Sequence, residues 1–502
     1  MLENLITNAN LIIPEIIVSV TLLLIVLFDL IFQKDKTIIP YISATGFLLA
    51  LFFTIRELNV NSYAFATSAT SNRYGLIAID SFGSYFKIIV LITSVLIIFF
   101  SKTSSEIKRI QDRSGEYYTL ITGMVLGMLF MVSAADLIMI YLSIELLSLS
   151  SYVLAGFTKL KTRNSEASLK YLIYGAVSSG LMLFGISLLY GMSGNTGLIF
   201  INTFLRNSSV NILTYSFSLI LIFVGIGFKL SAVPFHFWTP DVYEGAPISI
   251  TAFLSVASKA AGFAVLIRLL KTTFILDISD TGAWNLINFF DWRTFLIVIS
   301  ILTMTLGNFV ALWQNNLKRM LAYSSIAHAG YMLLAVATLS NQGILATMIH
   351  FLVYMLMNIG AFYIVMLIAN KTGSEDINDY NRLGYASPFL GVALSIFLIS
   401  LTGLPPLAGF ISKLYIFLAV IDAKLITVAV IAVINSVVSL YYYIRVLKHM
   451  FLSKAKTEPE HLKLSLNEII FILILLIPTL LFGLYFTPMV EFAKSSLSIL
   501  GY

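Results

Sequence analysis

The sequence of 502 residues contains no cysteine. Without thiolates the chain cannot form disulfide bonds, bind an iron–sulfur cluster through cysteine or build a cysteine-based zinc site. Charged residues are also scarce, at 11% of the chain, whereas soluble domains carry roughly 25%. With 59% hydrophobic residues and a mean hydropathy of +0.93, the composition indicates a polytopic membrane protein. The net charge of +6 does not indicate nucleic-acid binding, because the basic residues fall in short segments between apolar runs.

Apolar runs of about 20 residues, the length that crosses a bilayer as a helix, predict an all-α polytopic fold with about fourteen spans. The first run lacks the basic flank and cleavage site of a signal peptide, so we expect it to be a membrane span. We interpret residues 1–502 as a single membrane domain. The expected spans are 11–32, 38–55, 82–101, 118–134, 136–157, 169–192, 211–234, 247–270, 293–313, 320–339, 344–369, 390–418, 424–449 and 467–487.

Successive loops are alternately rich and poor in lysine and arginine, and the side with the richer loops is expected to face the cytoplasm. An even number of spans then places both termini on the non-cytoplasmic side of what we expect to be a bacterial inner (plasma) membrane. The richer loops hold Lys34, Lys36, Lys102, Lys108, Arg109, Arg113, Lys159, Lys161, Arg163, Lys318, Arg319, Lys371, Arg382, Lys448, Lys454, Lys456 and Lys463. The other loops hold Arg56, Arg73, Arg206, Lys271, Lys424 and Lys494.

Short stretches recur about 180 residues apart and predict a five-span repeat, 118–270 (spans four to eight) against 293–449 (spans nine to thirteen). An odd number of spans per copy inverts one copy relative to the other, which is the architecture of many transporters. The first three spans, within 1–117, and the last, 467–487, fall outside the repeat. The matching stretches are Lys170 to Tyr174 with His350 to Tyr354, Ile267 to Lys271 with Ile444 to Lys448, and Gly227-Phe228 with Gly409-Phe410.

The seventh and twelfth spans are each interrupted by proline close to a lysine. Lys229 ends a long apolar run and is followed by Pro234, and Lys413 follows the segment Gly403-Leu-Pro-Pro-Leu-Ala-Gly409. Proline removes a backbone donor, and a membrane tolerates a broken helix only where protein or water satisfies the freed groups. A lysine beside such a break indicates an ion path. The structural alternative is a lysine that snorkels from a helix end to the membrane surface.

Further titratable residues lie inside the predicted spans. Glu145 is mid-span in the fifth, where a lone carboxyl would be protonated and where Lys229 is its natural counter-ion. Lys259 lies near the centre of the eighth span among small residues, too deep to snorkel easily. His328 in the tenth span and His350 in the eleventh can relay protons, because the pKa of histidine is near neutrality. A static ion pair and core histidines with satisfied hydrogen bonds are the alternatives, and two histidines without carboxylates make a poor metal site.

Five of these residues form a line of titratable groups that can carry protons sideways in a hydrated core. Two unit charges about 7 Å apart interact by roughly 2.4 kcal/mol at an effective dielectric constant of 20. Moving one charge across 100 mV costs about 2.3 kcal/mol, so the two energies match. Displacement of one group can therefore load or unload its neighbour with a proton. The line is Glu145, Lys229, Lys259, His328 and Lys413.

The sequence resembles the antiporter-like membrane subunits of proton-pumping NADH:quinone oxidoreductase (respiratory complex I), and among them the subunit N (subunit 2) type. The resemblance covers most of the chain and is densest from about 118 to 420. The run from Trp238 to Pro247, the lysine in the twelfth span and the end of the chain soon after the fourteenth span are typical of subunit N. The other matching stretches are Asp136 to Ile138, Glu145, Ser148 to Tyr152, Asn164 to Ala167, Lys170-Tyr171, Gly227 to Ser231, Pro234 to His236, Lys318 to Ser325, His328 to Tyr331, Gly403 to Phe410 and Lys413.

This resemblance implies a fourteen-helix fold with five-helix inverted repeats and assigns roles to the buried charges. Glu145 and Lys229 would form a modulating pair, Lys259 the central relay and Lys413 the outlet-side group. NAD, FMN, iron–sulfur clusters and quinone would bind partner subunits, so we expect no cofactor and no metal on this chain. A neighbouring antiporter-like subunit and the other membrane subunits of the complex are the expected partners, together with the lipid bilayer and without nucleic acid.

The sequence therefore predicts a proton-translocating subunit that belongs to an NADH:quinone oxidoreductase and has no redox centre of its own. An Mrp-type or stand-alone cation/proton antiporter with the same fold is the first alternative, and the proteins that co-purify with the chain would discriminate the two. A structural scaffold, in which the buried charges are static pairs, is the second. Normal transport after neutralisation of Lys259 would favour the scaffold.

Overall fold

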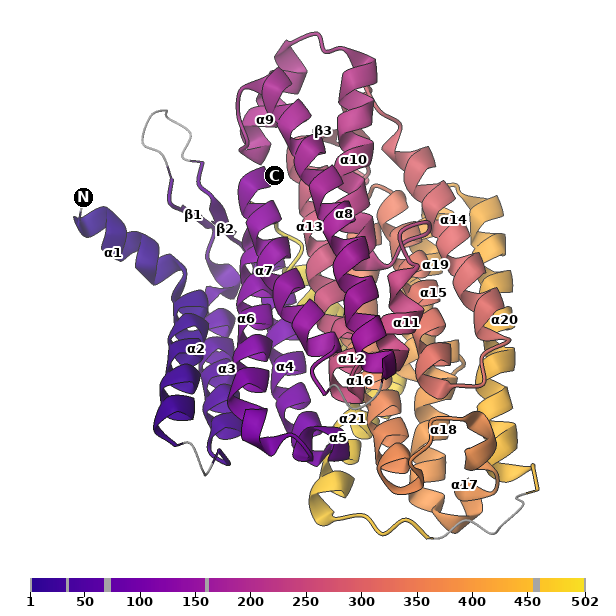
Figure 1. Cartoon of the computed structure of the whole chain (residues 1–502). Helices are drawn as coiled ribbons and strands as arrows, with labels where there is room; N and C mark the ends of the chain where they lie inside the picture. Colours follow the sequence, from indigo (N-terminus) through magenta and orange to yellow (C-terminus); the bar gives the residue numbers. More distant parts are fainter. Residues whose placement is uncertain (1, 33–35, 67–73, 159–161, 455–460, 501–502) are drawn as a thin grey trace.

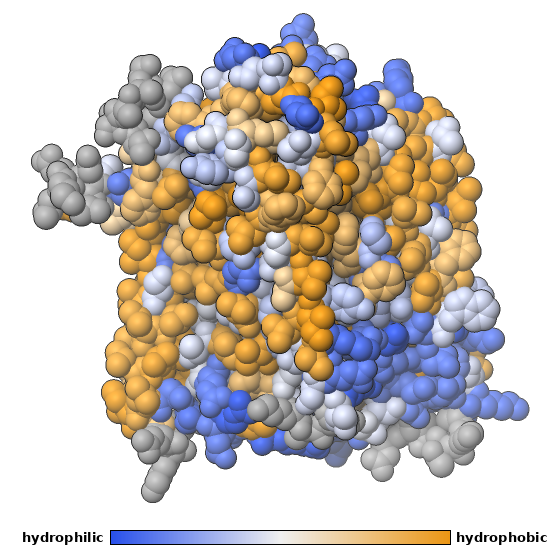
Figure 2. Space-filling view, turned by 45° about the horizontal axis from the view of Figure 1, so that its top comes forward, coloured by the Kyte–Doolittle hydropathy of each residue, from blue (hydrophilic) through white to orange (hydrophobic). Residues whose placement is uncertain are grey.

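The structure is a computed structural model that describes residues 2–32, 36–66, 74–158, 162–454 and 461–500 and is mostly helical. The long helices lie side by side as a bundle (Figure 1). Figure 2 shows hydrophobic residues over the sides of the bundle and hydrophilic residues gathered toward its two ends, as a bilayer requires. Some basic residues of the predicted loops lie outside the described residues, namely Lys34, Arg73, Lys159, Lys161 and Lys456.

Thirteen helical segments of the described chain are long and apolar enough to cross a membrane. Each coincides with one of the predicted spans. They are α2 (Ile13–Ile31), α3 (Ile39–Arg56), α4 (Ser81–Thr103), α6 (Ser114–Ser133), α7 (Leu137–Ala155), α8 (Thr162–Ser193), α10 (Ile212–Leu230), the continuous segment of α12 (Ile248–Phe253), η3 (Leu254–Ser258) and α13 (Lys259–Thr273), then α14 (Trp292–Ala311), α15 (Leu317–Ala337), α16 (Asn341–Thr372), α20 (Ile426–Phe451) and α21 (Leu466–Leu484).

The remaining predicted span, 390–418, consists of two shorter helices, α18 (Pro388–Thr402) and α19 (Ala408–Asp422). Gly403 ends α18 in the left-handed region, with a φ of 87°, a conformation that glycine adopts without steric cost. Two prolines follow, and proline cannot continue a helix. With 15 residues each, neither helix alone has the length that crosses a hydrocarbon core, so the two must cross it together.

Short elements connect the long helices at both ends of the bundle. Figure 1 shows α9 and the hairpin strands at the upper end, near both ends of the chain, and α5 and α17 at the lower end. Two antiparallel hairpins pair Ser62 with Ile79 and Ile278 with Trp284. The elements are α1 (Leu2–Leu11), β1 (Ser62–Ala64), β2 (Ile77–Ile79), α5 (Ser105–Lys108), α9 (Leu198–Asn207), α11 (Trp238–Gly245), β3 (Ile275–Ile278), β4 (Trp284–Leu286), α17 (Leu383–Ala386) and α22 (Thr487–Ser495).

Three segments form the centre of the bundle. The segment from α12 to α13 is buried along its whole length, and α15 and α16 are almost entirely buried, whereas α2 and α21 are largely exposed on the outside. These central helices contain Lys259, His328 and His350, which are all buried. A membrane helix whose polar residues face other helices can hold charges that lipid would exclude. The fold therefore places two members of the predicted line, Lys259 and His328, in its core together with His350.

The two segments of the predicted repeat share some local features. Helices α8 and α16 are both 32 residues long. Helix α8 packs on α10 and α11, and α16 packs on α18 and α19, which in each case are the helices on either side of an interruption. Asp136 caps α7 and bridges to Gly197, while Asn316 caps α15 and bridges to Asp376, 180 and 179 residues later. The first bridge precedes α9 at the upper end of Figure 1, and the second precedes α17 at the lower end. An inverted repeat requires such features at opposite ends of the bundle.

Candidate functional site

Lys229 lies at the end of α10, where the helix stops in the interior of the protein. Ser231 takes a left-handed conformation, with a φ of 60°, and ends the helix ahead of Pro234. The side chain of Lys229 is 1% exposed, and its Nζ has no hydrogen-bond partner among the described residues. Instead, Nζ lies 5.5 to 5.8 Å from the ring centroids of Tyr152, Tyr171 and Phe228. Aromatic faces attract a cation but do not neutralise it, so Lys229 depends on a more distant charge.

Glu145 on α7 supplies that charge. Its carboxylate acts electrostatically on Lys229, yet the two groups form no ion pair within the 4.0 Å that defines the salt bridges of the described chain. The Oε1 atom of Glu145 is buried and has no hydrogen-bond partner. Leu142, Leu146 and Leu149 on the same helix are exposed, so Glu145 lies at the edge of an apolar outer surface. This loose arrangement argues against a static pair whose purpose is to hold two helices together.

Lys259 begins α13, directly after the π-helical turn η3. Such turns occur frequently at functional sites, because they add a residue to the helix and redirect its side chains. The buried Nζ of Lys259 donates to the carbonyl oxygen and to Oγ of Ser325 on α15, both at 2.8 Å. Ser255 in the same turn accepts a hydrogen bond of 2.6 Å from Asn358. Lys259 is thus bound by neutral groups alone, with no ion pair to any described carboxylate.

The two histidines meet each other between α15 and α16. Nδ1 of His328 lies 3.1 Å from Nε2 of His350, and Nδ1 of His350 lies 3.0 Å from Oγ of Ser412 on α19. Tyr354 packs against both imidazole rings, with centroid distances of 5.0 and 6.0 Å. Each imidazole can donate from one nitrogen and accept at the other, so the two rings and the serine hydroxyl form a hydrogen-bonded chain that can pass a proton.

Lys413 follows Ser412 and is held by the broken helix. Its Nζ donates to the carbonyl oxygen of Thr402 at 2.8 Å and to Oγ of Ser436 on α20 at 3.1 Å, and it lies 4.8 Å from the ring centroid of Tyr331. Thr402 is the last residue of α18, where the carbonyls no longer have intrahelical partners. The glycine and the two prolines that end α18 therefore supply the acceptor that holds the buried ammonium group.

These contacts form a series from Lys259 to Lys413 that involves four helices, α13, α15, α16 and α19. Ser325, which accepts from Lys259, lies three residues before His328, a spacing that puts both side chains on one face of α15. His328 interacts electrostatically with both Lys259 and Lys413. The histidine pair and Ser412 then complete the route to Lys413. We call Lys259, Ser325, His328, His350, Ser412 and Lys413 the central chain.

Tyrosines extend this arrangement toward Lys229. Tyr171 lies beneath Lys229, and Tyr243 of α11 interacts with Tyr171 on one side and with Tyr354 and Ser325 on the other. Tyr243 and Tyr354 both lie beside Ser325, and Tyr171 lies beside Ser151. Buried hydroxyl groups gathered in this way offer polar positions at which water can bind inside a protein. The connection from Lys229 to the central chain is therefore polar.

A second buried cluster was not predicted from the sequence. Lys87 on α4 lies 2.7 Å from Oε1 of Glu15 on α2 and 3.4 Å from Oε2 of Glu57, and all three side chains are buried or nearly so. Glu15 lies near one end of the first predicted span, and α2 turns it inward onto α4. A single charge in an apolar run does not indicate which face of its helix is covered, so the sequence carried no signal for this cluster.

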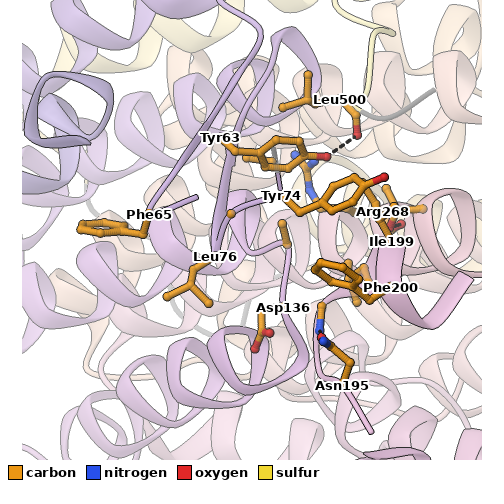
Figure 3. Close-up of a pocket in the computed structure, with 16 residues that line it drawn as sticks. Tyr63, Phe65, Tyr74, Leu76, Asp136, Asn195, Ile199, Phe200, Arg268 and Leu500 are labelled. Atoms are coloured by element: carbon orange, nitrogen blue, oxygen red, sulfur yellow. Dashed lines mark hydrogen bonds between the residues drawn. The ribbon is translucent and has the colours of Figure 1, made fainter. Parts of the chain in front are cut away.

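A buried Arg268–Asp80 pair was also missed. The guanidinium group binds both carboxylate oxygens of Asp80, at 2.6 and 2.8 Å, and Asp80 also caps α4 through the backbone nitrogen of Gly83. Arg268 also lines a cavity of about 290 Å³ at the upper end of the bundle. Figure 3 shows that Tyr63 closes this cavity by a hydrogen bond of 3.3 Å to the carbonyl oxygen of Leu500. The pair thus fastens α4, α13 and the C-terminal segment to one another.

An ionic network joins α11 to the second half of the molecule at the lower end of the bundle. Arg319 on α15 binds Asp241 and Glu244 of α11 at 2.7 and 2.8 Å, and Lys170 on α8 binds Asp241 at 2.6 Å. Lys318, in the first turn of α15, is buried and pairs with Glu375 at 3.2 Å. The loop after Lys229 is thereby attached to α15, the helix that bears His328.

The carboxylates of this network keep their charge at neutral pH. Burial raises the pKa of Asp241, but hydrogen bonds from Lys170 and Arg319 outweigh it, so its pKa lies below the ordinary 3.8. Burial also raises the pKa of Glu375, and the charge of Lys318 outweighs it, so that pKa lies below 4.5. Because both pKa values are depressed by folding, the network stabilises the protein above these ordinary values, and the stabilisation is lost only as the pH falls through the depressed pKa values.

Buried ammonium groups, paired imidazoles and helices interrupted at membrane depth define a class, the ion-translocating membrane proteins. Comparisons with known proteins agree. The family described as NADH:quinone oxidoreductase/Mrp antiporter, TM, matches residues 134–439. NADH-quinone oxidoreductase subunit N 2 of Chloroherpeton thalassium is 45% identical over 500 residues, which are 99% of this chain and 96% of that protein. The chain therefore belongs to this family and, within it, to the subunit N group.

Solved structures show the same fold. A chain of respiratory complex I from Thermus thermophilus is 28% identical and superposes with a TM-score of 0.76 over 96% of this chain and 99% of its own length. A chain of the Mrp complex from Dietzia superposes with a TM-score of 0.82 over 98% of this chain and 96% of its own, at 18% identity. The second likeness concerns the fold alone.

Proposed function

We propose that this chain is a proton-translocating membrane subunit of NADH:quinone oxidoreductase, in which Glu145, Lys229, Lys259, His328 and Lys413 carry or control the protons. The observation that supports it most is the central chain, in which two buried ammonium groups lie on either side of a hydrogen-bonded histidine pair. Lys259 donates to Ser325, three residues before His328, and His350 is hydrogen-bonded to Ser412, the neighbour of Lys413. A buried lysine without a carboxylate partner pays a large desolvation cost and is retained for function rather than for stability. Relatives along the full length are named as subunit N of this oxidoreductase.

Lys229 is the group that responds to events outside the chain. Because only aromatic faces touch its Nζ, its charge depends on Glu145, which lies at the outer surface of α7. A carboxylate beside exposed leucines is costly against lipid, so a neighbouring membrane subunit covers this surface in the complex. A charge that arrives next to Glu145 then weakens its hold on Lys229. The proton that Lys229 releases, or the field it alters, acts on Lys259 through the tyrosines.

The remaining assignments follow from this role. Quinone reduction takes place in partner subunits, where NAD, FMN, iron–sulfur clusters and quinone bind, and this chain contributes no redox centre. Residues 118–270 and 293–449 form two inverted halves, which the segments 1–117 and 467–487 flank. The basic loops face the cytoplasm of a bacterial cell, the membrane is the inner (plasma) membrane, and both termini lie on the opposite side.

Neutralisation of the modulating pair tests this function. In the assembled complex, Glu145→Gln and Lys229→Met should each lower NADH-driven proton pumping and the coupled quinone reduction, by about ten-fold or more, because removal of one partner leaves the other charge uncompensated. Both rates are measured in sealed membrane vesicles, and subunit content is measured by native gel. Glu166→Gln, which removes an exposed carboxylate on α8, is the matched control. Wild-type pumping by both variants of the pair would overturn the proposal.

The alternative function, an Mrp-type or stand-alone cation/proton antiporter, has one observation in its favour, the fold shared with a chain of the Mrp complex. Purification decides between the two. The proposed function requires that the chain co-purifies with quinone-reducing subunits in mild detergent. An isolated chain that exchanges Na⁺ for protons in liposomes would establish the antiporter instead.

A further inference from the structure

A cavity of about 850 Å³ opens at the lower end of the bundle, between α3, α4, α6 and α21, away from the central chain. Its two halves differ in chemistry. The part nearer the membrane interior is apolar and aromatic, and the part nearer the helix ends is basic and polar. The apolar half is lined by Val95, Leu96, Phe99, Ile470, Phe471 and Ile474.

The polar half is arranged to receive an anion. Lys102, in the last turn of α4, lies 4.1 Å above the ring of Tyr41 and donates to its hydroxyl, and Lys108 of α5 is exposed beside it. Lys36 also lines this half but is paired with Asp29 at 2.7 Å. The acidic lining residue Glu468 accepts from the backbone of Ser465 at the start of α21 and is therefore already engaged.

An unsatisfied buried donor points into the same space. Ser114 lines the cavity and is only 7% exposed. Its hydroxyl has no hydrogen-bond partner among the described residues. It is the first residue of α6, a helix of 20 residues whose N-terminus carries partial positive charge. A helix N-terminus, a free hydroxyl and two lysines together form a recognised type of phosphate site.

We propose that this cavity binds an anionic phospholipid. The phosphate lies among Lys102, Lys108 and the hydroxyl of Ser114, and an acyl chain follows the apolar half along α4 and α21. Charge complementarity selects the anionic headgroup, and the apolar half selects a lipid over free phosphate. Basic pockets between membrane helices at this depth are suited to such headgroups. The lipid would join the N-terminal helices α3 and α4 to α21, which are distant in sequence.

The test measures lipid retention in the intact complex. Purified complex is stripped with mild detergent and then titrated with phosphatidylglycerol, phosphatidylcholine or inorganic phosphate, and the bound lipid per complex is counted by mass spectrometry. The wild type should retain phosphatidylglycerol more tightly than phosphatidylcholine, and the double variant Lys102→Glu/Lys108→Glu should weaken that retention about ten-fold or more. The double variant Lys448→Glu/Lys454→Glu, which changes two exposed lysines outside the cavity, should behave as the wild type.

Ser114→Val provides a mild variant for the case that charge reversal prevents assembly, and it should weaken retention of phosphatidylglycerol without altering that of phosphatidylcholine. A photo-activatable phosphatidylglycerol should cross-link to peptides of α4 and α21. Equal retention of phosphatidylglycerol by the wild type and all variants would overturn the proposal. It would also be overturned if another protein chain, and not the lipid, were cross-linked at the cavity, or if the site bound phosphate but no lipid. Because the readout is bound lipid, it is independent of proton pumping.

Discussion

Replacement of Lys259 by methionine is expected to abolish proton pumping by the complex. The buried ammonium group of Lys259 is one end of the central chain and donates two hydrogen bonds to Ser325. Methionine has a similar volume and leaves no buried charge, so the helix packing should persist while the proton carrier is lost. A positioned proton-transfer group typically contributes about 100-fold or more to a rate. We expect a fall of that size in NADH-driven pumping, with quinone reduction falling in step.

The measurement uses inverted membrane vesicles and a pH-sensitive dye, with a native gel to establish that the complex is assembled. Lys259→Arg keeps a cation that can donate to Ser325 but does not release its proton. It should therefore assemble as the wild type does and pump as poorly as Lys259→Met. Restored pumping in Lys259→Arg would mean that only a fixed charge is needed. Normal pumping in Lys259→Met would favour a purely structural role for the buried charges.

Loss of the Arg268–Asp80 pair should have the largest effect on stability. Arg268 and Asp80 are buried and share two hydrogen bonds of 2.6 and 2.8 Å. Asp80 also accepts from the backbone nitrogen of Gly83, which caps α4, and from that of Leu500. Removal of one partner from a buried pair leaves an uncompensated charge and costs about 3 to 5 kcal/mol. Arg268→Met should therefore lower the amount of the assembled subunit strongly, whereas the double variant Arg268→Met/Asp80→Asn should recover part of it.

Thermal unfolding of the purified complex and the amount of subunit in membranes measure this effect. Arg293→Met is a suitable control, because Arg293 lies near the same end of the bundle and forms no ion pair among the described residues. Equal stability of the wild type and Arg268→Met would show that the pair does not fasten the C-terminal segment. A double variant less stable than Arg268→Met would show that the Asp80 carboxylate stabilises the fold through contacts other than its pair with Arg268, because asparagine keeps an oxygen that can cap α4.

Several features of this fold could be predicted from the sequence because the bilayer imposes them. Apolar length located the membrane helices, and Lys229 and Lys413 were identified because proline and glycine lie beside them. The division of span 390–418 into two helices of equal length was only partly foreseen. Composition shows that a helix breaks, but the exact ends depend on which free carbonyl oxygens find donors in the folded protein, as that of Thr402 does in Lys413.

The partners of the buried charges could not be predicted, because they come from distant parts of the chain. His328 and His350 lie on different helices, and nothing in either sequence stretch indicates that the two rings face each other. Asp80 is 188 residues from Arg268, and Glu15 and Glu57 approach Lys87 from two separate helical elements. Helix packing decides such pairings, and packing depends on the shape of whole faces rather than on local spacing.

The central chain is tested most directly by the variant His350→Leu. The measurement is the proton-to-electron ratio and the turnover of the complex that carries it. Leucine fills the space of the imidazole but breaks the link between His328 and Ser412, so this subunit should stop conducting. Pumping should fall by about ten-fold or more, whereas His350→Gln, which keeps a donor and an acceptor, should retain part of it. Wild-type pumping at an unchanged ratio in His350→Leu would contradict a proton route from Lys259 to Lys413.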